Sequence, residues 1–142
     1  MPDLGWRALQ PGMEQRLEVG AGPHGQDVLA LLYTMSPGGT YAIERELSAG
    51  ELNGPVELPL WGKATRVLHL AAVIVDERGV EHECALTLVP DDWRDLTMRF
   101  PSGPASWAAV RSIRLEDRTG LLGGQGPASV KIAGLPLAAG GS

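Results

Sequence analysis

Hydrophobic and polar residues alternate along most of the chain, in runs that have the length of strands. In the run that starts at Thr40, Tyr41 and Ile43 fall on one face, and Glu44 and Glu46 fall on the other. This period of two is typical of a β-strand with one buried face. Runs of this kind occupy residues 13–19, 27–33, 40–47, 55–61, 65–75, 80–89, 94–100, 110–117 and 128–137. The pattern therefore predicts eight or nine short strands and an all-β fold.

Turn signals separate these runs. The chain has 19 glycines and 11 prolines, and they recur about every ten residues, as turn-formers do in sandwiches and jelly rolls. Only residues 48–52 and 103–110 could each hold a helical turn, the first with Ser48 and Glu51 spaced as in a capping box. The glycine-rich residues 120–126 are expected to form a mobile loop. We predict an antiparallel β-sandwich of the jelly-roll type.

The run 65–75 departs from simple alternation because both of its faces are apolar. A sandwich strand with one solvated face carries polar residues at alternate positions, but here Val73 and Val75 stand opposite Leu70 and Ile74. Something must therefore cover the second face. The sequence leaves three alternatives: loops of the same domain, the turn at residues 106–110, or a partner protein.

Length, charge and hydrophobicity indicate the number of domains and argue against nucleic-acid binding and membrane insertion. The chain has 142 residues and a net charge of -5, so we expect one domain over residues 1–137, with 138–142 as a linker or tail. Its lysines and arginines are scattered along the sequence, so they form no positively charged surface that would attract nucleic acid. No run approaches the ~20 apolar residues of a membrane span, which predicts no direct insertion into a membrane. With Cys84 as the single cysteine, no internal disulfide can form.

Motifs for catalysis are missing. The sequence has no G-x-S-x-G elbow, no phosphate-binding loop and no dinucleotide-binding glycine motif, so neither an enzyme nor a cofactor is expected. His82 and Cys84 have a spacing that would allow two zinc ligands, but no second pair accompanies them. A buried strand face made of Val80, His82, Cys84 and Leu86 is the simpler interpretation.

Two motifs carry a resemblance to a known superfamily. Asp76 with Gly79 marks a hairpin after the long apolar run, and Asp92 with Trp93 opens the next strand. In this order, residues 26–137 resemble the galactose-binding-like β-sandwich superfamily, which includes many carbohydrate-binding modules. The resemblance implies a non-catalytic carbohydrate-binding or interaction module of a larger bacterial protein, extracytoplasmic or secreted, with a glycan and neighbouring domains as partners. Many such modules hold calcium through an aspartate in the final strand. Ala133 stands there in this chain, so we predict no metal.

A sugar-binding groove would combine aromatic faces with polar side chains. The candidate ligand-binding residues are Tyr41, Trp61, Arg45, Glu44, Tyr33 and Trp107. Each also has a structural interpretation in the core or at a strand end. Trp6 is expected to fasten the N-terminal segment to the sandwich. Trp93 is interpreted first as a plug at the end of the core, with Leu96, Met98 and Phe100 pointing inward after it, and second as a ligand-stacking residue.

A second resemblance covers only residues 57–100. This segment is similar to β-rich extracytoplasmic domains of FtsX-like ABC transporter permeases in actinobacteria, which implies a role in protein–protein contacts. The two alternatives share a fold and differ in partner, because a carbohydrate module binds glycans in isolation and a transporter domain does not.

Overall fold

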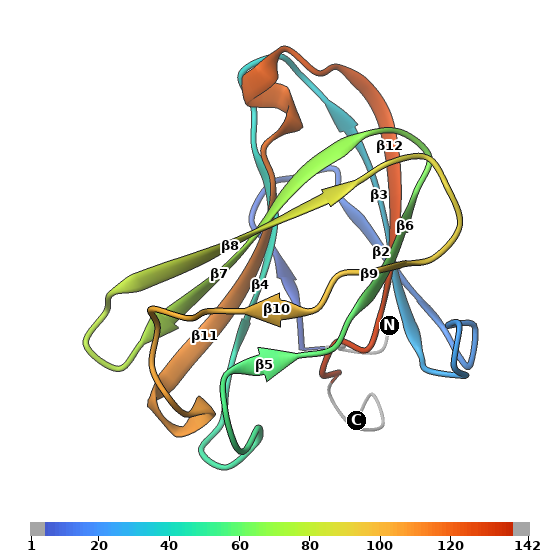
Figure 1. The fold of residues 1–142 in the computed structure, drawn as a ribbon. Coiled ribbons are helices and arrows are strands. Elements are labelled where there is room, and N and C mark those ends of the chain that lie inside the picture. Colours follow the sequence, from blue (N-terminus) through green and yellow to red (C-terminus); the bar gives the residue numbers. More distant parts are fainter. Residues whose placement is uncertain (1–4, 138–142) are drawn as a thin grey trace.

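The computed structural model describes residues 5–137, which form two five-stranded antiparallel sheets packed face to face (Figure 1). Sheet A has, in spatial order, the strands β1 (Arg7–Ala8), β4 (Tyr41–Glu46), β11 (Val110–Asp117), β7 (Leu68–Asp76) and β8 (Glu81–Leu88). Sheet B has the order β2 (Glu14–Glu18), β3 (Val28–Met35), β12 (Gly126–Ala133), β6 (Trp61–Ala64) and β9 (Arg94–Asp95). A short ribbon joins β5 (Glu57–Leu58) to β10 (Met98–Arg99). The predicted antiparallel β-sandwich is confirmed.

The core fills the space between the two sheets. In sheet B, Leu31 on β3 lies opposite Val130 on β12, and both are buried. Sheet A contributes Ile43 and Ile113 from its neighbouring strands β4 and β11. Each such side chain stabilises the fold by about 1.5–3 kcal/mol relative to exposure. The alternation that predicted the strands is thus the alternation between this core and the outer faces.

The second face of β7 is covered by charged side chains of the chain itself. Val73 is fully buried although it faces outward, between Arg114 on β11 and Glu83 on β8. Arg118, just after β11, pairs with Glu83 at 2.6 Å, and Arg114 pairs with Glu81 on β8 at 3.5 Å. These ion pairs span β7, since β7 lies between β11 and β8.

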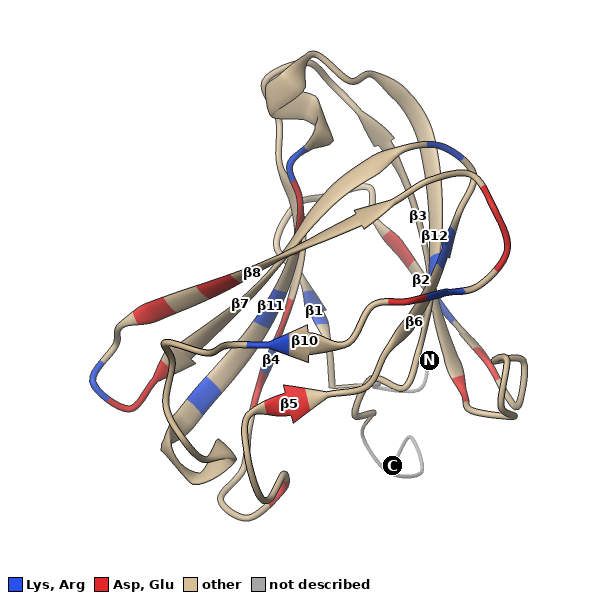
Figure 2. Ribbon diagram, viewed as in Figure 1, with Lys and Arg blue, Asp and Glu red and all other residues tan. Residues whose placement is uncertain are grey.

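The cover over Val73 comes from the same domain: Arg118 lies in the loop after β11, which agrees in part with the first predicted alternative, and the other charged side chains lie on the neighbouring strands. The aliphatic part of an arginine side chain can shield apolar surface while its guanidinium stays in water. Figure 2 shows the acidic segments of β8 and the basic segments of β11 on this sheet. An apolar strand of this kind therefore needs no partner protein over the region where Val73 lies.

Two predicted strands are broken. The run 55–61 divides into β5 and β6 around Pro59, which has no backbone N–H to donate to a ladder. The run 94–100 divides into β9 and β10 where Asp95 Oδ1 accepts hydrogen bonds from Thr97 N at 2.8 Å and Thr97 Oγ1 at 2.6 Å, a local turn typical of aspartate. Each break moves the chain between sheet B and the short ribbon.

Hydrogen bonds hold the three segments for which a helical turn or a mobile loop was expected. Residues 103–110 contain one 3-10 turn, η1 (Trp107–Ala109), with Ser106 Oγ accepting from Ala108 N. Residues 48–52 form no helix, and Glu51 Oε1 accepts from Ser48 N. The glycine-rich segment begins with η2 (Thr119–Leu122), which is docked by Gly38 N donating to Gly120 O at 2.7 Å. No helix in residues 5–137 is long or apolar enough to cross a membrane.

The N-terminal segment is fastened as predicted. Trp6 is 5% exposed, and its indole N–H donates to Pro136 O at 2.9 Å. The Trp6 carbonyl accepts from Gln15 Nε2 at 3.1 Å. The two-residue strand β1, which the alternation did not predict, then pairs with β4. Residues 1–4 and the predicted tail 138–142 lie outside the described part of the chain.

Candidate functional site

The outer face of sheet B carries one tryptophan of the predicted set, Trp61. On β6, Gly62 and Ala64 stand opposite the buried Ile132 and Val130, so both point into the core. A Cβ on Gly62 would lie 2.3 Å from Leu96 Cδ1, which confirms this direction. Because side chains alternate along a strand, Trp61 and Lys63 point outward. Trp61 is half-buried, so part of its indole remains open to solvent.

The loop between β2 and β3 forms one side of this face. Its exposed His24 packs edge-on against Trp61, with ring centroids 4.9 Å apart and planes at 69°. Gly22 lies so close to the sheet that a Cβ there would be 3.0 Å from Ala133 Cβ. Ala133 is consequently buried beneath the loop. The loop and the indole together give an aromatic corner with polar groups around it.

Cations occupy the middle of the same face. Lys63 on β6 and Lys131 on β12 are directly opposed in register, and Arg16 on β2 continues the row through Ala30 on β3. Figure 2 shows these basic segments on β6 and β12, with acidic segments on the outer strands β2 and β9. Lys131 Nζ lies 3.0 Å from Glu18 Oε1.

Lys63 also has a carboxylate partner, Asp92, in the loop before β9. The distance from Lys63 Nζ to Asp92 Oδ1 is 3.6 Å. On β9, Asp95 lies opposite Trp61 of β6. The hydrogen bond that Asp95 accepts from the Thr97 side chain lowers the pKa of Asp95. The face thus offers an aromatic surface, hydrogen-bond donors and acceptors, the combination that sugar rings and hydroxyls require.

The core-plug interpretation of Trp93 is wrong. Trp93 is half-buried and belongs neither to the core cluster nor to the side chains packed against it, among the described residues. Leu96, Met98 and Phe100 are buried as predicted. The chain enters β9 at the outer edge of sheet B, and continuing the register of Gly62 with Arg94 places Trp93 opposite Lys63. The ligand-stacking alternative for Trp93 therefore stays open.

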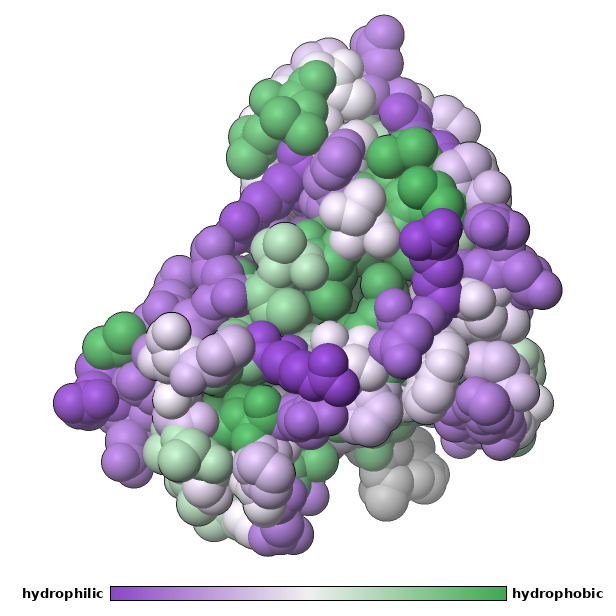
Figure 3. All heavy atoms as spheres, in the orientation of Figure 1, coloured by the Kyte–Doolittle hydropathy of each residue, from purple (hydrophilic) through white to green (hydrophobic). Residues whose placement is uncertain are grey.

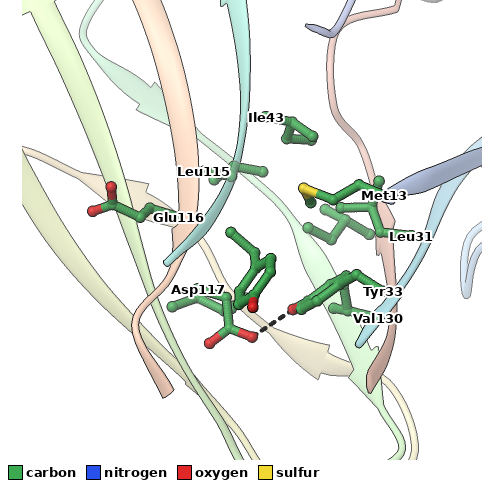
Figure 4. A pocket seen from close by; sticks show the side chains of 11 residues that line it. Met13, Leu31, Tyr33, Ile43, Leu115, Glu116, Asp117 and Val130 are labelled. Atoms are coloured by element: carbon green, nitrogen blue, oxygen red, sulfur yellow. Dashed lines mark hydrogen bonds between the residues drawn. The ribbon is translucent and has the colours of Figure 1, made fainter. Parts of the chain in front are cut away.

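Tyr33 lies at a different place, in a pocket between the two sheets (Figure 4), and Tyr41 lines the same pocket. Their rings stack with centroids 5.3 Å apart. Tyr33 is buried and its hydroxyl donates to Asp117 at 2.5 Å, whereas half-buried Tyr41 accepts from Ser36 N. Burial, and then the charge of Asp117, raise the pKa of Tyr33 above its ordinary value. The two tyrosines line a small pocket with apolar walls that include Leu31 and Ile43.

The other three predicted residues lie elsewhere. Glu44 points outward on sheet A and pairs with Arg7 at 3.1 Å. Arg45, next to it on β4, points inward, is buried and pairs with Glu51. Trp107 is buried in η1, and its backbone N–H donates to Gly54 O at 3.0 Å. The structure thus brings Tyr33 together with Tyr41, but it does not gather the six residues into one groove.

The remaining side chains of interest for chemistry are tied to structural partners. His82 Nε2 lies 3.0 Å from Asp76 Oδ2, and the half-buried Cys84 packs against the core. Within residues 5–137, no group of three or more His, Cys, Asp or Glu side chains could hold a metal ion. Figure 3 looks onto the open edge of the sandwich, where apolar side chains are visible between the polar rims.

The sequence reasoning missed His24, Lys63 and Lys131. One signal was available, because Lys63 and Lys131 are the two lysines of the chain. Their register across β6 and β12 was not available, since β6 begins inside a run that was predicted as a single strand.

Comparison with known proteins identifies the fold. No family model and no curated protein matches the chain. Among solved structures, the family 11 carbohydrate-binding module of a cellulosomal cellulase from Clostridium thermocellum is similar, with a TM-score of 0.54 and 16% identity over 93% of this chain and 89% of that one. TmCBM61, solved in complex with β-1,4-galactotriose, has a TM-score of 0.57 and 14% identity, covering 94% and 87% of the two chains.

A larger protein contains the same fold as one part. An exo-β-agarase matches with a TM-score of 0.67 and 8% identity over 94% of this chain, and this match covers 23% of the agarase. These likenesses confirm the predicted β-sandwich fold. At such identities they establish the fold, and a fold alone hosts many functions.

Proposed function

We propose that this chain is a non-catalytic carbohydrate-binding module that binds a glycan on the outer face of sheet B, around Trp61. The observation that carries the proposal is the partly open indole of Trp61, held edge-on by His24 on a sheet face with donors and acceptors around it. A pyranose ring stacks its C–H face on such an indole, and its hydroxyls bind the surrounding polar groups. The sandwich fold shared with glycan-bound modules supports this role.

The setting follows from the same proposal. Modules of this kind act beside other domains, as in the agarase, of which the matched part is 23%. We infer a bacterial, extracytoplasmic parent protein with neighbouring domains. The comparisons give no support to the transporter alternative, and ion pairs of the chain itself lie over Val73.

Affinity electrophoresis on a panel of soluble polysaccharides, followed by calorimetry, tests the proposal. Trp61→Ala should reduce affinity for the bound glycan about tenfold or more, because it removes the stacking surface. Tyr41→Ala is the matched control, since Tyr41 lies at the pocket between the sheets. A chelator should leave binding unchanged.

Three results would contradict these claims. Loss of binding in Tyr41→Ala alone would move the site to the Tyr33 and Tyr41 pocket. Chelator-sensitive binding would refute the prediction of metal independence. Absence of binding to every glycan of the panel would overturn the proposed function and return attention to a protein partner.

A further inference from the structure

The placement of the lysines is the most unusual feature of the outer face of sheet B. The chain has 12 basic residues and a net charge of -5, and Lys63 and Lys131 are its two lysines. They are directly opposed across β6 and β12. Directly opposed residues have Cβ atoms about 4.5–5.5 Å apart, and like charges in such a pair are destabilising. An acidic protein therefore holds its two ammonium groups together on one face.

The carboxylate partners hold the two ammonium groups from opposite sides. Glu18 lies on β2, beyond β3 and away from β6, and it pairs with Lys131. Asp92 lies in the loop before β9, away from β12, and it pairs with Lys63. Because β6 and β12 are adjacent, no other strand lies between them that could bring in a carboxylate. Both carboxylate partners therefore come from the outer sides of the lysine pair, and neither lies on its inner side.

Both lysines remain accessible to a group from outside the chain. Their side chains are 46% and 41% exposed. Arg16, in the same register row, is exposed and makes no ion pair with any described residue. Between Arg16 and Lys131 stands Ala30, whose small side chain leaves the row open. A third cation is thus available along the same line.

The carboxylates of the face do not fill this row. Asp95 accepts two hydrogen bonds from Thr97, and Glu18 and Asp92 are each paired with one lysine. Glu14 lies in the next row on the edge strand β2, opposite Leu32. The two lysines therefore lie in the middle of the face, and carboxylates lie along both of its borders.

We propose that the lysine pair binds an oxyanion substituent, a carboxylate or a sulfate, of a sugar that stacks on Trp61. This inference rests on the proposed function and names its ligand class as an anionic glycan. Lys63 stands two residues from Trp61 on the same face of β6, about 7 Å along the strand. One sugar residue, or two neighbouring ones, can therefore lie on the indole and direct an oxyanion between the two ammonium groups, where charge-assisted hydrogen bonds form.

The test is calorimetry of the full chain with three polysaccharides. Polygalacturonate carries carboxylates, carrageenan carries sulfates, and galactan carries neither. The chain should bind at least one of the two anionic polymers about tenfold more tightly than galactan, and this preference should weaken as salt is added. The anionic polymer that binds more tightly identifies the oxyanion.

Variants then assign the preference to the lysines. In the double variant Lys63→Gln and Lys131→Gln, affinity for the anionic polymer should fall about tenfold and affinity for galactan should stay the same. The reason is that the lost charge-assisted hydrogen bonds form only with the anionic ligand. Replacing both lysines with arginine should retain the preference. Arg78→Gln, at the exposed turn after β7 on the other sheet, is the control with one charge removed elsewhere.

The outcomes separate this inference from the proposed function. Equal affinity for galactan and the anionic polymers, unaffected by the lysine variants but reduced in Trp61→Ala, would overturn the anion site and leave the glycan face intact. Absence of binding to all three polymers and to the wider panel would overturn both. Because Arg78→Gln removes one charge and the double variant removes two, a loss of binding free energy in Arg78→Gln half as large as in the double variant would show a general charge effect and refute the lysine site.

Discussion

The hydrogen bond from Tyr33 to Asp117 joins sheet B to sheet A inside the molecule. Tyr33 is 5% exposed and Asp117 is 3% exposed, with a distance of 2.5 Å between their oxygens. Tyr33→Phe keeps the ring and its stacking on Tyr41 and removes only the hydroxyl. This substitution therefore isolates one contact between the sheets.

The expected cost follows from the partners that remain. A hydrogen bond to a charged group contributes about 1.5–3 kcal/mol. In Tyr33→Phe, Asp117 still accepts from Thr119 N and Thr119 Oγ1, so the buried carboxylate keeps two donors. We expect a loss near the lower end of that range. Urea unfolding followed by tryptophan fluorescence measures it, with Tyr41→Phe as the control, since the Tyr41 hydroxyl accepts only from the Ser36 backbone.

The same bond gives the protein a specific response to alkaline pH. Burial and the charge of Asp117 raise the pKa of Tyr33 in the folded state. An unfolded tyrosine ionises near pH ~10 while the folded one stays neutral, so this stabilisation is complete below about pH 10 and is lost as pH rises further. The loss from this residue is about 1.4 kcal/mol per pH unit. Tyr33→Phe should lack it, and unfolding curves of equal alkaline slope in the two proteins would refute the reasoning.

Three further substitutions test other parts of the fold. Trp93→Ala should cost less than about 1 kcal/mol because Trp93 lies outside the core, whereas Trp107→Ala should cost about 3–5 kcal/mol; similar costs in urea unfolding would restore the core-plug interpretation. The hydrogen bond from His82, then that from Val80, lowers the pKa of Asp76 to about 2, so its stabilisation is present above its unfolded pKa and is lost as pH falls toward 2. Asp76→Asn should reduce the pH dependence of stability in this acid range, and an unchanged acid profile would contradict the assignment. Gly120→Ala should destabilise by about 1–3 kcal/mol, since its Cβ would lie 2.3 Å from a backbone oxygen; a melting temperature equal to that of the parent would show that the loop can move aside.

Much of the fold could be predicted from the sequence because the alternation of side chains directly records the two faces of each strand. The runs at residues 27–33 and 110–117 correspond to β3 and β11. Alternation does not show where one run divides into two strands that pair with different strands, so the break at Pro59 between β5 and β6 was missed. It also does not distinguish a half-open edge from a buried end, which is why Trp93 was placed in the core.

The candidate site was less predictable because its parts are distant in the sequence. His24, Trp61 and Lys131 come from a loop and from two strands that become neighbours only after sheet B assembles. Composition identified Trp61 as an aromatic candidate, but no local pattern connects it to the other two. The apolar run 65–75 was also misleading when taken alone. The charged side chains that cover it come from β8, from β11 and from the arginine after β11, and these segments flank β7 only in the folded sheet.

The hydrogen bond between Trp6 and Pro136 has a mechanical consequence. It joins Trp6, just before β1, to Pro136, just after β12. Tension applied to both ends would therefore act first on this clamp and on the short strand β1, before it reached the long central strands. Until this hydrogen bond breaks, such a load would not reach β12 or Trp61 on the adjacent strand β6.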